Sequence, residues 1–332
     1  MARGELRKGM NKAVDYFQFV LRSVDEKVRF YRFLVLVIPD GVLIPQYLNV
    51  SSPKLKIVKH SDFIPLQYLP TFNPEMVKVY LHKIPGLSND FIFLNENTFF
   101  LSDVELSLFR KLDTGSYIVR TIENAFFPKS GFIKDASRSH TYATYPSPIP
   151  SHLKFDTLSP VLLNRPFLTR LLENEYPLLV QNISTHKFLL PDQISMLEFY
   201  LIHLVQAHPP PSQPKDSKDS KLNLVFEDSL LKVLEDIEKN SNQIDNWRSK
   251  NKILNIPDIL LLNLHQQAEI GSLLYTLYPN LSRLEVDVED YSRIGLFVAV
   301  MFWFGGITIC YTFTRMMGGH IKEDAFGGKR EL

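Results

Sequence analysis

The sequence predicts an α/β protein, with a mixed sheet flanked by helices and one transmembrane helix near the C-terminus. Short apolar, β-branched runs alternate with longer stretches of helical periodicity along most of the chain, which favours a sheet covered on both faces. A single long uncharged stretch follows them. The composition, with 45% hydrophobic and 22% charged residues, is typical of a folded protein and excludes wholesale disorder.

The N-terminal elements follow from apolar spacing and from turn residues. Residues 1–32 carry apolar side chains at helical spacing. The run Phe33–Ile38 is β-branched and ends at an Asp-Gly turn, which predicts a buried strand. The expected elements are a helix within 1–32, strands at Phe33–Ile38 and Leu55–Lys59, a helix at Pro74–Ile84 that Pro85-Gly86 stops, and a third strand at Phe91–Leu94.

The second half of the chain reads as mostly helical. Residues 158–206 place Leu and Phe at spacings of three and four, which predicts helices. Residues 207–221 are rich in Pro, Ser and charge, so they form an expected surface insertion or linker. Helical periodicity returns at Phe226–Lys239 and Pro257–Tyr278.

Charge and motifs exclude several classes of function. The 332 residues hold 37 Lys+Arg against 36 Asp+Glu, and a net charge of +1 argues against a nucleic-acid partner. Cys310 is the one cysteine, so an intrachain disulfide and a multi-cysteine zinc site are impossible. The patterns GxxxxGK[ST], GxGxxG, HExxH and GxSxG do not occur, so P-loop, dinucleotide, zincin and hydrolase readings lack support.

The stretch 294–314 is the expected transmembrane helix. It contains twenty-one residues without a charge, between Arg293 and Arg315, and about 20 apolar residues cover the ~30 Å hydrocarbon core. A buried core helix is the alternative. The N-terminus has no early apolar run and so predicts no signal peptide. We therefore expect a single-pass membrane protein with a short tail at 315–332.

Two features disagree on the orientation of this helix. Basic residues dominate the tail and acidic ones precede the helix, which would put the tail in the cytosol and residues 1–292 in the lumen. The C-terminal Lys329–Leu332 is similar to a lumenal endoplasmic-reticulum retrieval address, which requires the opposite orientation, unless the match is due to chance. Both readings predict the endoplasmic reticulum or Golgi, and the orientation stays open.

Polar residues directly follow two of the expected strands. His60-Ser61-Asp62 comes after the second strand and Asn95-Glu96-Asn97 after the third. In open α/β sheets ligands bind beyond the carboxyl ends of strands, so these are candidate site residues. The alternative is a helix cap or a turn, which the same residue types favour.

The run His60–Phe100 closely resembles the second conserved region of the Stealth family. That family includes bacterial capsule phosphotransferases, the lysosomal-enzyme N-acetylglucosamine-1-phosphotransferase and fungal sugar-phosphate transferases. Shorter segments are similar to other parts of its pattern: Glu5–Arg7, Leu21–Val24 and Leu36–Leu48 upstream, Pro160–Arg165 and Thr185–Ser195 in the third region, and Leu277–Glu285 in the fourth. The resemblance implies a Stealth-like domain over 1–286, with region-2-like, region-3-like and region-4-like parts at 1–115, 156–206 and 222–286.

The resemblance implies transfer of a sugar-1-phosphate from a nucleotide sugar to a glycan hydroxyl. Such chemistry needs a divalent cation (Mg or Mn) or basic residues for the diphosphate, and a base for the hydroxyl. His186 is the expected base because imidazole titrates near working pH, and a capping or packing histidine is the alternative. The implied site residues are His186 and Glu96 as catalytic groups, Arg7, Arg22, His82, Asn95, Arg165 and Lys187 as substrate contacts, and Asp192 and Asp258 as metal ligands.

Departures from the family pattern fall on charged positions. The family's Asn-Asp-Asp is Asn95-Glu96-Asn97 here, and its acidic pair at Asp192 continues with Gln193. Leu158 and Leu189 stand where histidine and arginine are usual, only Asp258 remains of a later acidic pair, and the first conserved region is not recognisable.

Three hypotheses stay open. The first is a membrane-anchored transferase of the secretory pathway. The second is a catalytically silent homologue that binds a partner transferase or a glycan. The third is an anchored α/β protein without a small-molecule role. The transferase hypothesis expects the ends of the second and third strands to share a pocket with His186, whereas Leu158 and Leu189 would fill that pocket in a silent homologue.

Overall fold

The computed structural model describes most of the chain up to residue 286. The described residues are 16–122, 154–155, 157, 159–191, 193–207, 224–225, 248, 251–256 and 264–286, all within the compact unit Met1–Val300. The predicted transmembrane helix at 294–314, the tail and the helix at Phe226–Lys239 lie outside these residues. Among the residues described, no helix is both long and apolar enough to cross a membrane.

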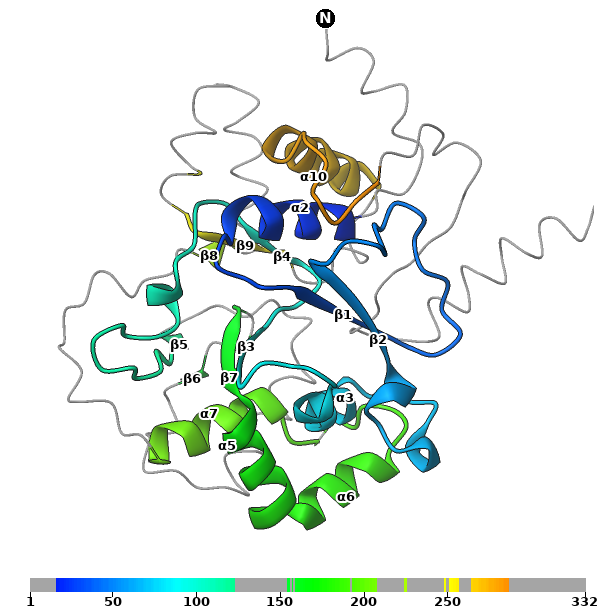
Figure 1. The fold of residues 1–332 in the computed structure, drawn as a ribbon, viewed down its shortest axis with the longest axis vertical. Coiled ribbons are helices and arrows are strands. Elements are labelled where there is room, and N and C mark those ends of the chain that lie inside the picture. Colours follow the sequence, from blue (N-terminus) through cyan, green and yellow to red (C-terminus); the bar gives the residue numbers. More distant parts are fainter. Residues whose placement is uncertain are drawn as a thin grey trace, which may run out of the picture. The chain divides into compact units, whose positions relative to one another are not determined.

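The fold is a mixture of helices and short strands (Figure 1). The helices are α2 (Phe17–Lys27), α3 (Pro74–Tyr80), α5 (Arg165–Thr169), α6 (Pro177–Thr185), α7 (Met196–Ala207) and α10 (Leu264–Leu277), with a π-helical turn at Arg170–Glu175. The strands are β1 (Leu34–Ile38), β2 (Leu55–Lys59), β3 (Asp90–Phe93), β4 (Thr98–Phe100), β5 (Thr121–Ile122), β6 (Lys154–Phe155), β7 (Val161–Asn164), β8 (Leu224–Val225) and β9 (Ile253–Asn255).

The predicted strands are confirmed, but one continuous mixed sheet is not. β2 has the predicted bounds, β1 begins one residue later than predicted, and both ends of β3 lie one residue earlier than predicted. β1 and β2 pair in parallel, β3 pairs antiparallel with β7, β9 lies between β4 and β8, and β5 pairs with β6. The α/β class is therefore correct, but the described strands form several small sheets. The partners of β3 and β4 are distant in sequence, so local patterns do not predict these pairings.

The prediction that residues 158–206 are helical throughout is wrong at two places. Val161–Asn164 forms β7, because a short apolar run satisfies a strand as well as a helix. The segment from His186 to Ser195 is not helical and separates α6 from α7. At β7 the chain changes to a helix where Asn164 accepts a hydrogen bond from Phe167 N (2.9 Å), with Pro166 in the first turn.

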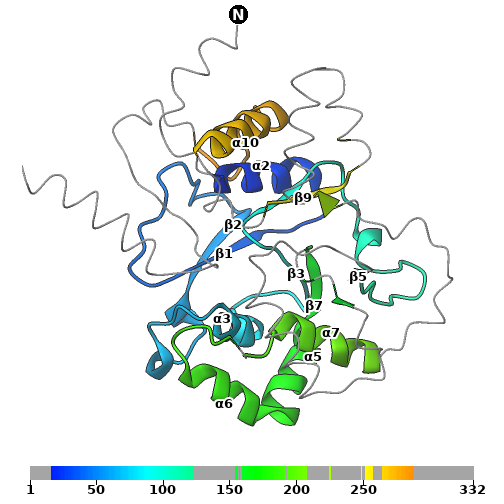
Figure 2. The ribbon, with the colours of Figure 1, turned by 180° about the vertical axis from the view of Figure 1, so that it is seen from behind.

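One hydrophobic core joins α2 and α10 to β4 and β9. Its side chains include Phe19, Val24, Phe99, Leu254 and Leu274, all nearly inaccessible to solvent. The residues 18–24 of α2 are all buried, so this part of the helix is enclosed on every side and not on one face alone. Figures 1 and 2 show α2 and α10 running close together beside these strands.

A second group of helices surrounds the β3–β7 pair. α3 contacts α6 and α7, and α5 contacts β7 (Figure 2). Asn73 caps α3 by accepting a hydrogen bond from Glu75 N (3.1 Å) with Pro74 at the first position, so the helix begins at the predicted residue. This group places the segment after α6 against the segment that precedes α3.

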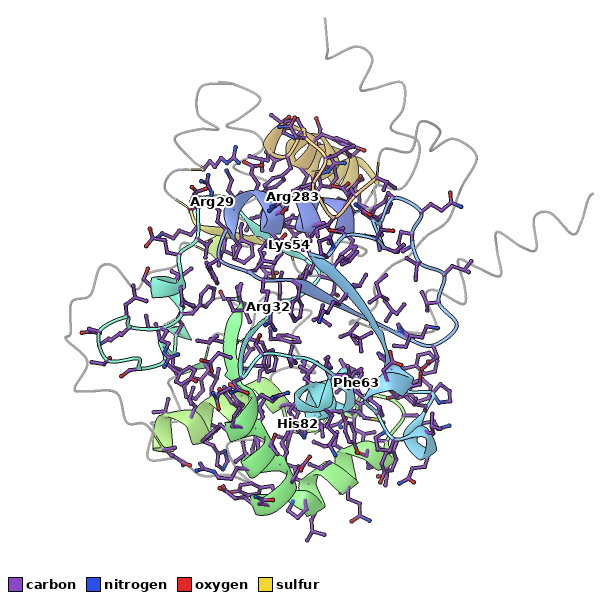
Figure 3. All side chains as sticks on the ribbon, in the orientation of Figure 1. Arg29, Arg32, Lys54, Phe63, His82 and Arg283 are labelled. Carbon is purple, nitrogen blue, oxygen red and sulfur yellow. The ribbon has the colours of Figure 1, made fainter. Side chains whose placement is uncertain are left out.

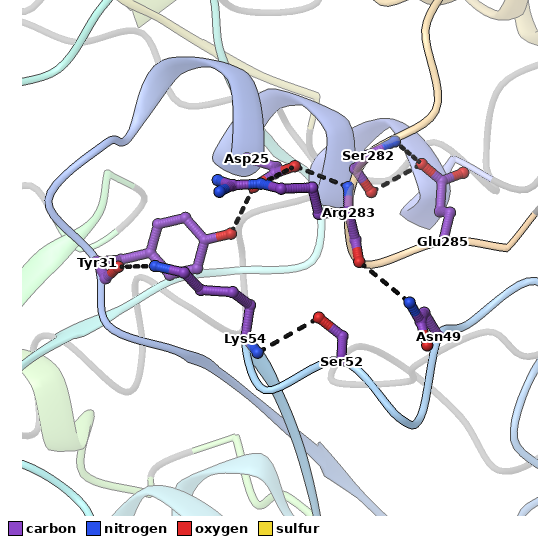
Figure 4. A network of polar contacts seen from close by, with 8 residues as sticks. All are labelled: Asp25, Tyr31, Asn49, Ser52, Lys54, Ser282, Arg283 and Glu285. Carbon is purple, nitrogen blue, oxygen red and sulfur yellow. Dashed lines mark hydrogen bonds and ion pairs between the residues drawn. The ribbon is translucent and has the colours of Figure 1, made fainter.

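The segment 282–286 returns to the N-terminal part of the fold (Figure 4). Leu48 forms a bridge with Glu285, and Asn49 N donates to Leu284 O (2.8 Å). Arg283 donates to Asp25 from its backbone (2.8 Å) and from its guanidinium, while Tyr31 donates its hydroxyl to the same carboxylate (2.7 Å). Burial raises the pKa of Asp25, but the bonds from Arg283 and Tyr31 outweigh it and lower that pKa.

Candidate functional site

The buried side-chain amide of Asn73 connects His186 to the start of α3. Asn73 is fully buried, and its Nδ2 donates to His186 O (3.0 Å) and to Gln193 Oε1 (3.0 Å). Its Oδ1 accepts from Glu75 N, so one side chain fixes three segments. We call Asn73 with these three partners the Asn73 clamp. Because a buried amide is costly without its partners, the clamp sets the position of His186.

A neighbouring carboxylate strengthens this connection. Glu75 Oε2 accepts from Met196 N (2.7 Å) at the start of α7, and Glu75 Oε1 pairs with Lys78 (2.7 Å). Gln193 Oε1 also accepts from Leu190 N (3.2 Å). The loop between α6 and α7 is therefore attached to α3 at several points, and Asp192 in that loop lies outside the described residues.

The imidazole of His186 has a defined tautomer when it is neutral. Nδ1 lies 2.9 Å from Asn182 O, and a carbonyl oxygen only accepts, so Nδ1 carries the hydrogen. Nε2 then holds the lone pair, and in the described part of the chain it makes no hydrogen bond. The ring is partly exposed at the C-terminal end of α6. This arrangement allows His186 to take a proton through Nε2 from a group that approaches from solvent.

Two phenylalanine rings lie next to His186. Phe72 and Phe188 form a bridge between the two segments, with Phe72 N donating to Lys187 O (2.8 Å). Their rings are nearly parallel, at an interplanar angle of 10° and a centroid distance of 5.4 Å. They are 54% and 58% exposed, and Lys187, which directly precedes Phe188 in the chain, is exposed as well. The two rings therefore form a small contiguous apolar surface that is accessible to solvent.

The polar residues after β2 act as turn and cap residues. Ser61 N donates to Asp40 Oδ2 (3.1 Å), which joins the carboxyl ends of β1 and β2. Asp62 Oδ2 accepts from Lys59 N (2.8 Å) in a capping box. His60 is buried, and burial lowers its pKa. The capping alternative therefore accounts for these three residues.

The polar residues after β3 connect two strands. Asn97 Nδ2 donates to Ile256 O (3.0 Å), and Ile256 N donates to Asn97 O (3.2 Å), so this residue links β4 to the end of β9. Asn95 O accepts from Thr98 N (3.3 Å), and Glu96 between them is partly buried. These bonds and those of His186 run to different parts of the fold. A pocket shared by the strand ends and His186 stays a prediction.

Three further predicted contacts have protein partners. Arg22 is buried and paired with Glu285, His82 Nε2 lies 3.0 Å from Glu173 Oε1 beside α3 (Figure 3), and Arg165 donates to Asn89 (3.2 Å). Burial lowers the pKa of His82 although Glu173 opposes that shift. A phosphate contact by Arg22 would require the guanidinium to leave a buried carboxylate. Arg7, Asp192 and Asp258 lie outside the described residues.

The described residues alone do not fit a metal ion. No group of three or more His, Cys, Asp or Glu among them is placed to hold one. Glu96 is the one predicted carboxylate ligand or catalytic acid that the structure describes, since Asp192 and Asp258 fall outside. A metal site at Asp192 and Asp258 stays a prediction, because both residues lie outside the described part of the chain.

A shallow hollow lies elsewhere, beside Asp90. Its volume is about 370 Å³, and its lining includes Tyr117, Asn164 and Arg170. Asp90 accepts hydrogen bonds from Tyr117 (2.7 Å) and from Asn164 (2.7 Å), and pairs with Arg110 (3.0 Å). Burial, with the Asp90 bond, raises the pKa of Tyr117 to about 12. None of the described site residues that the sequence predicted lines this hollow, so we do not place the reaction there.

Buried histidines make stability depend on pH. Burial lowers the folded-state pKa of His60, His82 and His203 below the ordinary histidine value of 6.5, so the unfolded chain binds more protons as pH falls. We expect this stability to be complete above that value and to be lost as pH falls from 7.5 to 5.5. Urea unfolding midpoints at the two pH values measure it.

The carboxylates Asp25 and Glu173 titrate in a lower window. Their pKa values are lowered from 3.8 and 4.5, so their contribution to stability is present above those values and disappears only below them.

The control for the histidine prediction is His203→Gln, which removes one of the three imidazoles and should reduce the fall in stability between pH 7.5 and 5.5. A midpoint equal or higher at pH 5.5 in the unmodified chain would contradict the account.

The comparisons with known proteins agree with the sequence prediction. Residues 11–118 match the profile of "Stealth protein CR2, conserved region 2". A capsular polysaccharide phosphotransferase of Streptococcus thermophilus is 45% identical over 65 residues, which are 20% of this chain and 27% of that protein. A capsular polysaccharide phosphotransferase of Haemophilus influenzae is 34% identical over 106 residues (32% and 29%). The human N-acetylglucosamine-1-phosphotransferase subunits alpha/beta are 36% identical over 88 residues (26% and 7%).

These relatives define a class of proteins that are named for phosphotransfer to or from sugars. Residues 11–118 are similar to the second conserved region of the Stealth family, and the predicted resemblance is confirmed for this region. The matched stretch spans less than a third of the length of each of these relatives. The resemblance of 156–206 and 222–286 to further Stealth regions stays a prediction.

Sequence reasoning missed the residues that position His186. It named His186, Lys187 and Asp192, but not Phe72, Asn73 or Phe188. The run Pro70–Pro74 encloses Phe72 and Asn73 between two prolines, which is a turn signal. That signal marks the bend, while the partner segment lies 113 residues away and is not encoded locally.

Proposed function

We propose that the protein transfers a sugar phosphate from a nucleotide sugar to a hydroxyl group of a glycan. The observation that carries this proposal is the position of His186, whose backbone carbonyl the Asn73 clamp holds and whose Nδ1 donates to Asn182 O, which leaves Nε2 as the proton acceptor of a partly exposed ring. The Stealth relatives support the class of reaction, since they are named as polysaccharide and N-acetylglucosamine phosphotransferases. Phosphoryl transfer depends on positioning and charge, which suits a rigid surface site.

The proposed step needs one proton acceptor. His186 Nε2 takes the proton of the acceptor hydroxyl while that oxygen attacks the phosphorus bound to the sugar. A new oxygen–phosphorus bond forms, and the bond to the bridging oxygen breaks. The nucleoside monophosphate leaves with that oxygen, and the product is a sugar–phosphate–glycan diester.

A metal site and a membrane anchor are two further expected features, and most of their residues lie outside the described part of the chain. We propose that Asp192 and Asp258, with Glu96, would hold a divalent cation that neutralises the diphosphate. We also propose that residues 294–314 anchor the domain in the membrane of the endoplasmic reticulum or Golgi, where glycan acceptors occur.

The direct test is release of nucleoside monophosphate. The purified full chain is incubated with a panel of nucleotide sugars, manganese and neutral oligosaccharides, and the nucleoside monophosphate is measured by chromatography. We expect release that depends on both donor and acceptor. Absence of release with every donor would reject the transferase and leave the silent homologue.

The silent homologue has one specific observation in its favour. Asn97 stands where the family has a carboxylate, and its Nδ2 donates to Ile256 O (3.0 Å), which a carboxylate cannot do. The amide therefore suits a structural role. Leu189, at the position of an expected arginine, has no charge for a phosphate.

The variant Asn97→Asp separates the two hypotheses. We expect it to lose about 1–3 kcal/mol of unfolding free energy, because Ile256 O loses its donor and meets a negative charge. Urea unfolding measures this cost, with Asn95→Asp as the matched control. If Asn97→Asp instead raises monophosphate release without loss of stability, the family's carboxylate still has its catalytic place here.

A further inference from the structure

We propose that an outer face of the stacked ring pair Phe72–Phe188 is a stacking site for a pyranose ring of a neutral glycan. The two rings are held rigidly but are not covered by other side chains of the fold. Both rings are more than half exposed, whereas Phe99 and Phe199 are fully buried. We infer that this exposed apolar surface is the part of the site that contacts a ligand.

The rings are held in place from the backbone. The bridge between Phe72 and Phe188 and the bond from Phe72 N to Lys187 O (2.8 Å) fix the two segments, and the Asn73 clamp fixes them again one residue further along. At an interplanar angle of 10° and a centroid distance of 5.4 Å the two rings stack on each other, so each supports the other and the pair presents its outer faces and edges to solvent. A flat, preorganised face loses little entropy on binding, which favours a flat ligand.

The size of the surface argues against a stable protein interface. A whole phenylalanine side chain offers about 200 Å², so two half-exposed rings offer roughly 200 Å² together. A stable protein complex buries about 800 Å² on each partner. One sugar ring, in contrast, matches this area and has an apolar face of C–H groups that packs on an aromatic ring.

The polar groups beside the rings suit a carbohydrate. Lys187 is exposed next to Phe188 and donates hydrogen bonds through its ammonium group. His186 Nε2 accepts a hydrogen bond from a hydroxyl. A sugar that stacks on the rings thus has an acceptor for one of its hydroxyl groups at His186, two residues before Phe188 in the chain. The inference rests on the proposed function and assigns the glycan acceptor to this surface.

The experiment measures binding without catalysis. The full chain is labelled with 4-fluorophenylalanine, and the ¹⁹F signals of Phe72 and Phe188 are assigned from Phe72→Leu and Phe188→Leu. Neutral trisaccharides of glucose, mannose and N-acetylglucosamine are then added separately at millimolar concentration. We expect one of them to shift both signals and to receive saturation transfer from the aromatic protons at its C–H groups.

Matched variants separate a flat ring from general apolar surface. Each leucine variant keeps an apolar side chain but loses the flat face, and we expect roughly three- to tenfold weaker binding. Phe72→Tyr keeps the ring and should keep binding. Phe30→Leu removes another exposed ring, 39% exposed and packed against Phe109, and should have no effect.

The outcomes distinguish this inference from the proposed function. Binding that is lost in the leucine variants supports the site even where no monophosphate is released. Transfer to a glycan that is unchanged in Phe72→Leu and Phe188→Leu overturns the site and leaves the transferase standing. Absence of any shift with all three trisaccharides, or equal binding by the leucine variants, also overturns it.

Discussion

Replacement of Arg22 by Met is expected to destabilise the fold by about 3–5 kcal/mol, because it leaves Glu285 buried without its counter-charge. The Arg22 guanidinium contacts both carboxylate oxygens of Glu285 at 3.0–3.1 Å, and neither side chain is more than 6% exposed. Nη1 also donates to Tyr278 O (3.1 Å). The pair therefore ties α2 to the segment that follows α10.

The double variant Arg22→Met with Glu285→Leu should recover more than half of this loss. Removing both charges avoids the cost of an isolated buried charge, although Ser282 N and Oγ lose the acceptor that Glu285 Oε2 provides at 2.9 Å. Urea unfolding of the four chains gives the coupling energy. Arg22→Lys is the matched control, since it keeps the charge and loses the bidentate contact.

The result also decides the role that the family pattern implied for Arg22. A substitution that costs less than about 1 kcal/mol would mean that the buried pair contributes little. If Arg22→Met then raised the Michaelis constant for the nucleotide sugar, the guanidinium would be a phosphate contact after all. A large stability loss supports the structural role that the contacts show.

The sequence predicts local elements of this fold better than their partners. β1, β2 and the start of α3 follow from apolar runs, a turn and a capped proline, all of which are local signals. β7 was read as helix because Val161–Asn164 is a short apolar run next to helical sequence. The antiparallel pairing of β3 with β7 depends on residues about 70 positions apart, which periodicity does not encode.

The same limit applies to the candidate site. His186 was predicted from a resemblance, and the structure adds the clamp that holds it. Arg22 looked like a free cation in the sequence because its partner Glu285 is 263 residues away. The sequence does not distinguish Phe72 and Phe188 from core residues, since an exposed phenylalanine has no distinct pattern in a single sequence.

Replacement of His186 by Asn is expected to lower the turnover of sugar-phosphate transfer by about 10²- to 10⁴-fold, because the substitution removes the proton acceptor. Asparagine keeps an N–H donor that reaches a nearby carbonyl as Nδ1 does toward Asn182 O. The fold at the end of α6 should therefore persist, and the unfolding midpoint should change little. Monophosphate release with donor and acceptor at saturation measures the loss.

A positional role for His186 predicts a different pattern from a catalytic one. If Nε2 is the base, the limb of the pH–rate profile that reports deprotonation of the base disappears in His186→Asn, whereas the Michaelis constant for the glycan changes little. Asn73→Ala should act through the clamp: it releases His186 O and Gln193 Oε1 and lowers turnover, but it leaves that limb in place. A His186→Asn variant with unchanged turnover would remove His186 from the mechanism and transfer the role of base to another group, with Glu96 the next residue to test.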